Sequence, residues 1–100
     1  MAGVFLEIIF NAADFAASGI EGRDEIEDLL EERLSDLDLG EVTGGGAGSG
    51  SVIVDVEIDD EQKLDEALSV ISRALRELNV PPSTVITRSK PTKISYQIYN

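Results

Sequence analysis

The chain has no cysteine, no histidine and no tryptophan among its 100 residues. Without cysteine it can form neither disulfides nor zinc-thiolate sites, and it has no thiolate nucleophile. Without histidine it lacks the side chain whose unperturbed pKa lies near neutrality, which is also the commonest metal ligand. No nucleophile, base and orienting group can be named together in this sequence. We therefore expect a protein that is not an enzyme and that uses no cofactor and no metal.

Positive charge is scarce, with 8 lysines and arginines against 20 carboxylates, a formal net charge of -12 and a pI of about 4.1. Such a chain repels nucleic acid and anionic membranes and attracts basic proteins. Long hydrophobic runs are missing too, because the opening MAGVFLEIIF is far shorter than the roughly 20 residues of a spanning helix. We expect a single cytoplasmic domain, residues 1–100, that binds neither nucleic acid nor membranes.

Two segments are predicted to form strands. Val4 to Phe10 is rich in β-branched and aromatic residues, and side chains in Ser51 to Asp59 alternate between an apolar face and a largely acidic one. Their expected core faces consist of Leu6, Ile8, Phe10, Val52, Val54, Val56 and Ile58. Shorter strands are expected at Glu41 to Thr43, Thr84 to Arg88 and Ile94 to Tyr99, with a turn at Ser89 to Pro91 before the last of them.

Two amphipathic helices are predicted, one from Arg23 to Leu37 and one that ends at Asn79. The second helix is expected to begin at a capping box formed by Asp59 and Gln62. The expected core stripe of the first helix is Ile26, Leu29, Leu30, Leu34 and Leu37. The connection from residue 11 to residue 22 is rich in small residues, and we expect a loop with at most one short turn.

Glycine is concentrated in residues 44–50, which we predict to form a flexible loop between two strands. A phosphate-binding loop is not indicated, because a strand follows the glycines and no lysine is close. The element order is then β-α-β-β-α-β with an extra C-terminal strand. This order predicts an α+β, ferredoxin-like fold with an antiparallel sheet, two helices on one sheet face, and the first and third strands at the centre.

Ten carboxylates lie between Glu21 and Glu41, against only Arg23 and Arg33. Those that lie within the predicted helix form an outward face, for which the simplest interpretation is solubility. The functional interpretation is a surface that meets a basic partner. Its candidate residues are Glu25, Asp28, Glu31, Glu32 and Asp36 of the helix together with Gly46 and Gly48 of the glycine run.

The phrases GEVTGGGAGSGSVIVDVEID and RELNVPPSTVI, with the strand-helix opening, resemble small acidic bacterial proteins of ferredoxin-like shape. Some proteins of that kind are immunity partners of toxins. From the acidic face we expect a non-enzymatic binding module that blocks or regulates a basic protein partner, and an immunity-type inhibitor of a basic, nuclease-like toxin is one concrete form of it. The alternative is a small-molecule sensing or enzymatic domain that binds its ligand between the glycine loop and the uncovered sheet face and forms a homodimer through exposed Phe5, Ile9 and Ile53. Separately, Glu7 with Asp55 or Glu57 could form an acid-base pair on that face, for which the simpler interpretation is a solvated surface.

Overall fold

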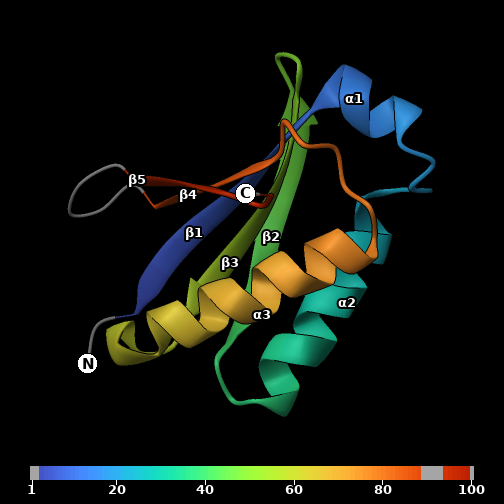
Figure 1. The fold of residues 1–100 in the computed structure, drawn as a ribbon. Helices are drawn as coiled ribbons and strands as arrows, with labels where there is room; N and C mark the ends of the chain where they lie inside the picture. The colour runs from blue at the N-terminus through green and yellow to red at the C-terminus, as the bar shows by residue number, and fades with distance from the viewer. Residues whose placement is uncertain (1–2, 89–93, 100) are drawn as a thin grey trace.

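The computed structural model describes residues 3–88 and 94–99. Figure 1 shows the arrangement of the helices and strands, which follow one another in a mixed α and β order. The elements are β1 (Val4–Asn11), α1 (Ala12–Ala17), α2 (Arg23–Asp36), β2 (Gly40–Gly48), β3 (Ser51–Ile58), a 3-10 turn η1 (Glu61–Lys63), α3 (Leu64–Glu77), β4 (Val85–Arg88) and β5 (Ile94–Gln97).

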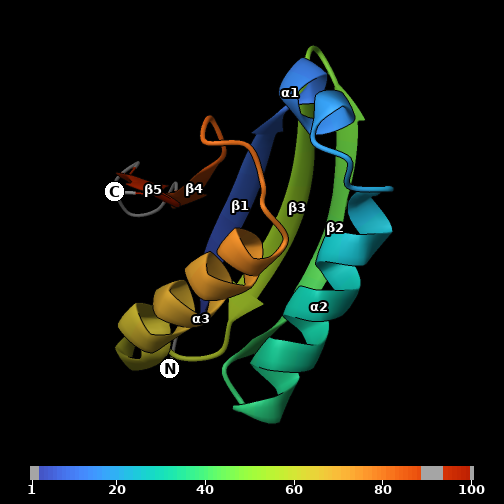
Figure 2. The ribbon, with the colours of Figure 1, turned by 45° about the vertical axis from the view of Figure 1, so that its right-hand side comes forward.

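The strands form one five-stranded sheet with the order β2-β3-β1-β4-β5, and every neighbouring pair is antiparallel. Strands β1 and β3 pair along their whole length, from Val4 opposite Ile58 to Asn11 opposite Ser51, which confirms their predicted central position. Helices α2 and α3 cover one face of the sheet (Figures 1 and 2). The α+β class and the antiparallel sheet are confirmed, and the arrangement is compatible with a ferredoxin-like fold.

The core lies between these two helices and the sheet. Because side chains alternate along a strand, β1 turns Leu6, Ile8 and Phe10 toward the helices, and all three are fully buried as predicted. The opposing layer comes from the stripes of the two helices. Its fully buried members are Ile26, Leu30, Leu34, Ala67, Ile71, Ala74 and Leu75.

The predicted stripe of α2 is wrong at its last position, because Leu37 is 51% exposed while Leu39 is 1% exposed. After α2 the chain adopts a positive φ at Asp38, and the amides of Asp38 and Leu39 donate to the carbonyls of Ser35 and Leu34. This is a Schellman motif, which reverses the chain and places the residue after the left-handed position against the helix. Leu39 therefore takes the core position that the helical period assigned to Leu37.

Two further expectations about local structure are corrected. The connection after β1 contains a helix, α1, whose start is capped by the Asn11 side chain, which accepts from the amide of Asp14 at 3.0 Å. Buried Phe15 fixes this helix by an edge contact with Phe10, whose ring centroid lies 5.1 Å away. The predicted cap at Asp59 is also wrong by one residue. Asp60 caps the 3-10 turn η1 that precedes α3, and its carboxylate accepts a hydrogen bond from the amide of Gln62.

The prediction of a glycine loop over residues 44–50 is wrong for Gly44 to Gly48, which belong to β2 and pair with β3. A β-bulge between Val42 and Gly44 interrupts the pairing, and only Ser49 and Gly50, both with positive φ, form the turn. The well-formed β3 offers a full ladder of hydrogen bonds, and this outweighs the low strand propensity of glycine. The predicted turn at Ser89 to Pro91 lies outside the described residues.

Truncation of the buried and exposed leucines at the end of α2 tests this description. We expect Leu34→Ala to lower the free energy of unfolding by about 2–5 kcal/mol, because it leaves a cavity in the core. Leu37→Ala should change it by less than about 0.5 kcal/mol, because that side chain is exposed. Urea denaturation measures both, and equal losses in the two variants would contradict the observed end of α2.

Candidate functional site

The five predicted carboxylates of α2 are all exposed, so the predicted acidic face exists as a surface. They differ in what they contact. Glu31 accepts a hydrogen bond from the edge amide of Val42 at 2.9 Å and another from the Ser35 hydroxyl at 3.3 Å. Glu25 accepts from the amide of Glu21 at 3.3 Å, just before the helix. Glu31 therefore ties α2 to strand β2, and its role is structural in this fold.

The remaining three, Asp28, Glu32 and Asp36, make no hydrogen bond or ion pair within residues 3–88 and 94–99. They are spaced by four residues, and Asp24 continues the same spacing toward the helix start. Residues four apart are neighbours on a helix surface. We call these four residues, Asp24, Asp28, Glu32 and Asp36, the acidic stripe. Asp24 was not among the candidate residues predicted from the sequence, although it shares the spacing of four.

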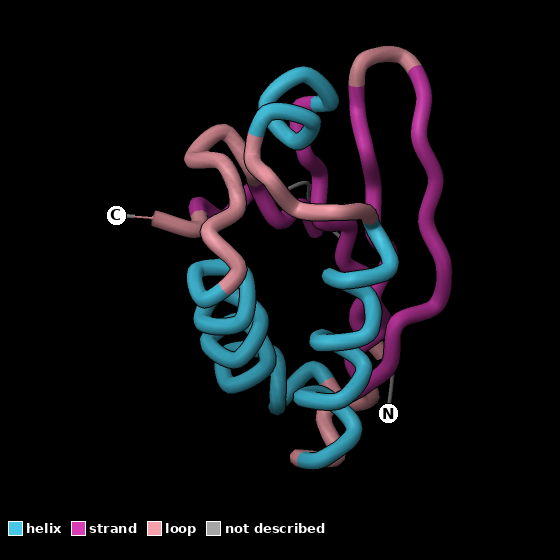
Figure 3. Tube along the Cα trace, turned by 90° about the vertical axis from the view of Figure 1, so that its right-hand side faces the viewer, coloured by secondary structure: helices cyan, strands magenta, loops and turns pink. Residues whose placement is uncertain are grey.

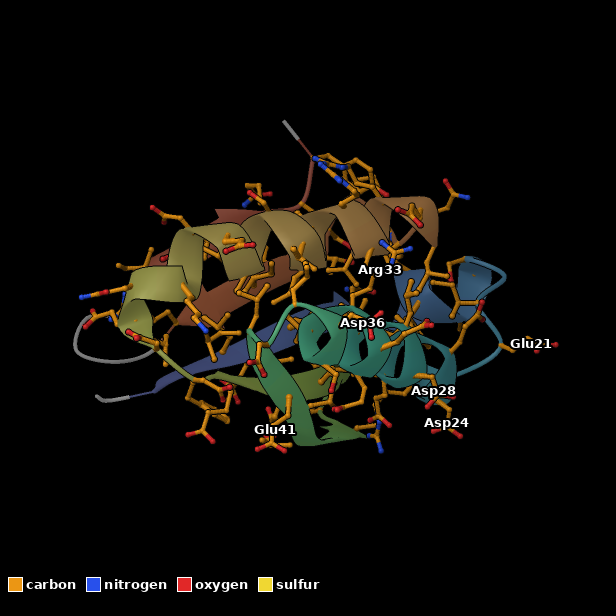
Figure 4. The ribbon with its side chains drawn as sticks, turned by 90° about the horizontal axis from the view of Figure 1, so that it is seen from below. Glu21, Asp24, Asp28, Arg33, Asp36 and Glu41 are labelled. Atoms are coloured by element: carbon orange, nitrogen blue, oxygen red, sulfur yellow. The ribbon has the colours of Figure 1, made fainter. Side chains whose placement is uncertain are left out.

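The two arginines of α2 pair with carboxylates outside the acidic stripe. Arg23 contacts Glu27 at 2.8 Å, and Arg33 makes a bidentate contact with Glu77 of α3, with N···O distances of 2.6 and 3.1 Å. Figure 4 shows Arg33 on the side of α2 that faces α3, whereas Asp24 and Asp28 point away from α3.

The Arg33–Glu77 pair also shifts the ionisation of both partners. The guanidinium lowers the pKa of Glu77, chiefly through the hydrogen bond, and the carboxylate in turn raises the pKa of Arg33. The charge of Glu32 also raises the pKa of Arg33, but by less than Glu77 does. The guanidinium of Arg33 is therefore bonded to α3, and no arginine of α2 forms an ion pair with the acidic stripe.

Strand β2 forms one edge of the sheet. In the described part of the chain it pairs with β3 and with no other strand. Figure 2 shows α2 running alongside β2, which agrees with the contact between Glu31 and Val42. The β2–β3 hairpin extends beyond α2 (Figures 1 and 3), and Gly46 and Gly48 lie toward its tip. The structure therefore separates these two glycines from Glu32 and Asp36, near the other end of α2.

The opposite face of the sheet carries the groups considered for a homodimer or for paired carboxylates. Glu7 and Asp55 face each other across β1 and β3, and one carboxylate oxygen of Asp55 is buried without a hydrogen-bond partner. Phe5 is 45% exposed, and Ile9 and Ile53 are half-buried. Two copies packed through this face would bring like charges together, because its apolar side chains surround carboxylates. That cost disfavours the homodimer on physical grounds.

Within residues 3–88 and 94–99, no three carboxylates lie close enough together to hold a metal ion. No helix in this part of the chain combines the length and apolar character needed to cross a membrane. No protein-family model matches the chain, and no curated protein matches it. The function of the protein is therefore inferred from the geometry and charge of its surfaces.

The close packing of β2 on β3 can be tested at two adjacent glycines. A Cβ atom at Gly45 would overlap the carbonyl oxygen of Ile53, whereas a Cβ at Gly46 would meet nothing within 4 Å. We expect Gly45→Ala to lower the free energy of unfolding by about 1–3 kcal/mol. Gly46→Ala should leave it unchanged or raise it by up to about 1 kcal/mol, because alanine restricts the unfolded chain.

Thermal and urea unfolding of the two variants provide the comparison. Each variant adds one methyl group at neighbouring positions of the same strand, so each serves as the control for the other. A loss at Gly46 as large as the loss at Gly45 would show that β2 does not approach β3 as described.

Proposed function

We propose that this protein is a non-enzymatic binding module whose acidic stripe on α2 contacts a basic surface of another protein. The observation that carries the proposal is the absence of any bonded counter-ion at Asp28, Glu32 and Asp36 in the described residues, while both arginines of α2 pair elsewhere. As part of this proposal we assign the chain to the ferredoxin-like class, as a single cytoplasmic domain with β5 as the additional strand.

The dimensions of the acidic stripe suit an extended cationic site. Asp24 and Asp36 are twelve residues apart, which corresponds to about 18 Å along a helix at 1.5 Å per residue. Aligned carboxylates can occupy a cleft that otherwise holds the phosphates of a nucleic acid strand. An immunity-type inhibitor of a basic, nuclease-like toxin is the concrete form of this proposal, and complementary charge would speed its association.

The energetic cost of the acidic stripe supports a role beyond solubility. Like charges four residues apart destabilise a helix by about 0.2–0.5 kcal/mol per pair, and the acidic stripe contains three such pairs. Solubility requires net charge but does not require its alignment on one helix. An aligned, unpaired arrangement that weakens its own helix is the arrangement expected of a surface kept for a partner.

Charge reversal on α2 tests the proposal. The variant Asp28→Lys/Glu32→Lys/Asp36→Lys leaves Glu31 in place, so the contact with Val42 remains. Stopped-flow association with a fluorescent polylysine peptide serves as the probe, measured over a series of salt concentrations. We expect the variant to associate at least about tenfold more slowly at low salt, with a flatter salt dependence, because steering is lost.

The matched control reverses three exposed carboxylates elsewhere, in the variant Glu57→Lys/Asp59→Lys/Glu66→Lys. Both variants change the net charge by the same amount, so they separate the position of the charge from its total. The control should retain most of the native association rate. Equal slowing in the two variants would mean that only net charge matters, and the proposed site on α2 would be abandoned.

A further inference from the structure

A groove of about 320 Å³ lies between α3 and β5, on a part of the molecule that the acidic stripe does not include. We call it the α3–β5 groove, and its polar lining consists of Ser69, Ser72, Arg73, Arg76, Tyr96 and Gln97. None of its lining residues is acidic, although 20 of the 100 residues of the chain are aspartate or glutamate. The groove is therefore a local exception to the charge of the protein.

The two arginines of the groove are also exceptions within the chain. The other arginines of the described residues each pair with a glutamate, in the bridges Arg23–Glu27, Arg33–Glu77 and Arg88–Glu61. Arg73 and Arg76 make no ion pair within residues 3–88 and 94–99. Arg76 makes only a long hydrogen bond of 3.4 Å to the carbonyl of Ile98, and Arg73 makes no hydrogen bond in that part of the chain.

The carboxylate best placed to neutralise Arg73 is already occupied. Glu77 lies one helical turn beyond Arg73 and receives both terminal nitrogens of Arg33, at 2.6 and 3.1 Å. Arg73 lowers the pKa of Glu77 less than Arg33 does, because it acts only at a distance. Two guanidinium groups thus remain available at one groove in a protein that has an excess of carboxylates.

The helix brings these groups together on one side. Ser69, Ser72, Arg73 and Arg76 follow the i, i+3, i+4, i+7 spacing of a single helical face, while the opposite face of α3 enters the core. Tyr96 and Gln97 of β5 lie across the groove from them. The groove therefore offers guanidinium forks and hydroxyl groups toward one space, bordered by the ring of Tyr96 and by the side chain of Leu68.

We propose that the α3–β5 groove binds the phosphate group of a small phosphomonoester. The planar guanidinium matches phosphate oxygens in bidentate contacts, and serine hydroxyls can donate to the remaining oxygens. A phosphomonoester carries close to two negative charges at neutral pH, which two arginines can balance, whereas a carboxylate carries one. The volume is at the lower end of the range for small-molecule sites, about 300–1,000 Å³.

The second cavity of comparable size does not offer this chemistry. It lies between α1 and the segment that follows α3, and its charged lining residue is Asp14, which accepts a hydrogen bond from the Ser83 hydroxyl at 2.7 Å. In contrast, the charged residues that line the α3–β5 groove are Arg73 and Arg76, and none of its lining residues is acidic. The charge of the lining therefore favours an anion at the α3–β5 groove over the second cavity.

Titration of the full chain with phenyl phosphate, followed by amide and arginine side-chain NMR shifts at constant ionic strength, tests this proposal. We expect saturable shifts at Ser69, Ser72 and Gln97, and weaker binding of benzoate, which has a ring of the same kind but a single charge. Arg73→Gln should weaken phenyl phosphate binding by about tenfold or more, as expected for the loss of a charge-assisted hydrogen bond.

The control is Arg23→Gln, which removes the same charge from α2 and breaks only an exposed pair on the helix surface. It should bind phenyl phosphate as the native protein does. Because Arg73 makes no bond in the described residues, its replacement tests binding without loss of the fold, and the retained NMR spectrum verifies this. Shifts that do not saturate, equal losses in the two variants, or benzoate binding as tight as phenyl phosphate would overturn the proposal.

Discussion

The fold depends on the burial of one side of α2 against the sheet. This burial must outweigh the repulsion between the unpaired negative charges on the other side of the helix. Full burial of a leucine or isoleucine side chain contributes about 1.5–3 kcal/mol, and α2 buries Ile26, Leu30 and Leu34 completely. Each like-charge pair of the acidic stripe costs only about 0.2–0.5 kcal/mol. Burial therefore outweighs repulsion, and the Schellman motif after α2 adds Leu39 to the same core.

Specific polar contacts then fix where this charged helix lies. Glu31 reaches the edge of β2, and Arg33 reaches α3, so two of the charged groups of α2 serve the fold. The contact with Glu77 directs the positive charge of Arg33 toward α3, while the carboxylates of the acidic stripe stay exposed to solvent. The α3–β5 groove has the reverse character, since its arginines remain unpaired in the described residues. The molecule thus presents two surfaces of opposite charge, on different elements.

The central strands and the two long helices, α2 and α3, could be predicted because their apolar periods are regular, as in the alternation that buries Leu6 and Ile8. Helix α1 could not, because its six residues are too few to show a helical period. The end of α2 could not, because a left-handed aspartate, unlike a glycine, is a weak signal for a Schellman motif. A loop was predicted for the glycine run because the low strand propensity of glycine describes the segment alone. In the structure β3 supplies the hydrogen bonds that make this segment a strand. The contact of Glu31 with Val42 and the groove beside Arg73 depend on tertiary placement, which no local spacing reveals.

The fold does not need the acidic stripe. The variant Glu32→Gln/Asp36→Asn removes charge from the C-terminal half of α2, where carboxylates also oppose the helix dipole. Urea unfolding at low and at high salt is the direct measurement. We expect the variant to have a free energy of unfolding higher than that of the native protein by about 0.4–1 kcal/mol at low salt, and the difference to disappear at high salt. A variant less stable than the native protein at low salt would contradict it, since those carboxylates would then be part of what holds α2 in place.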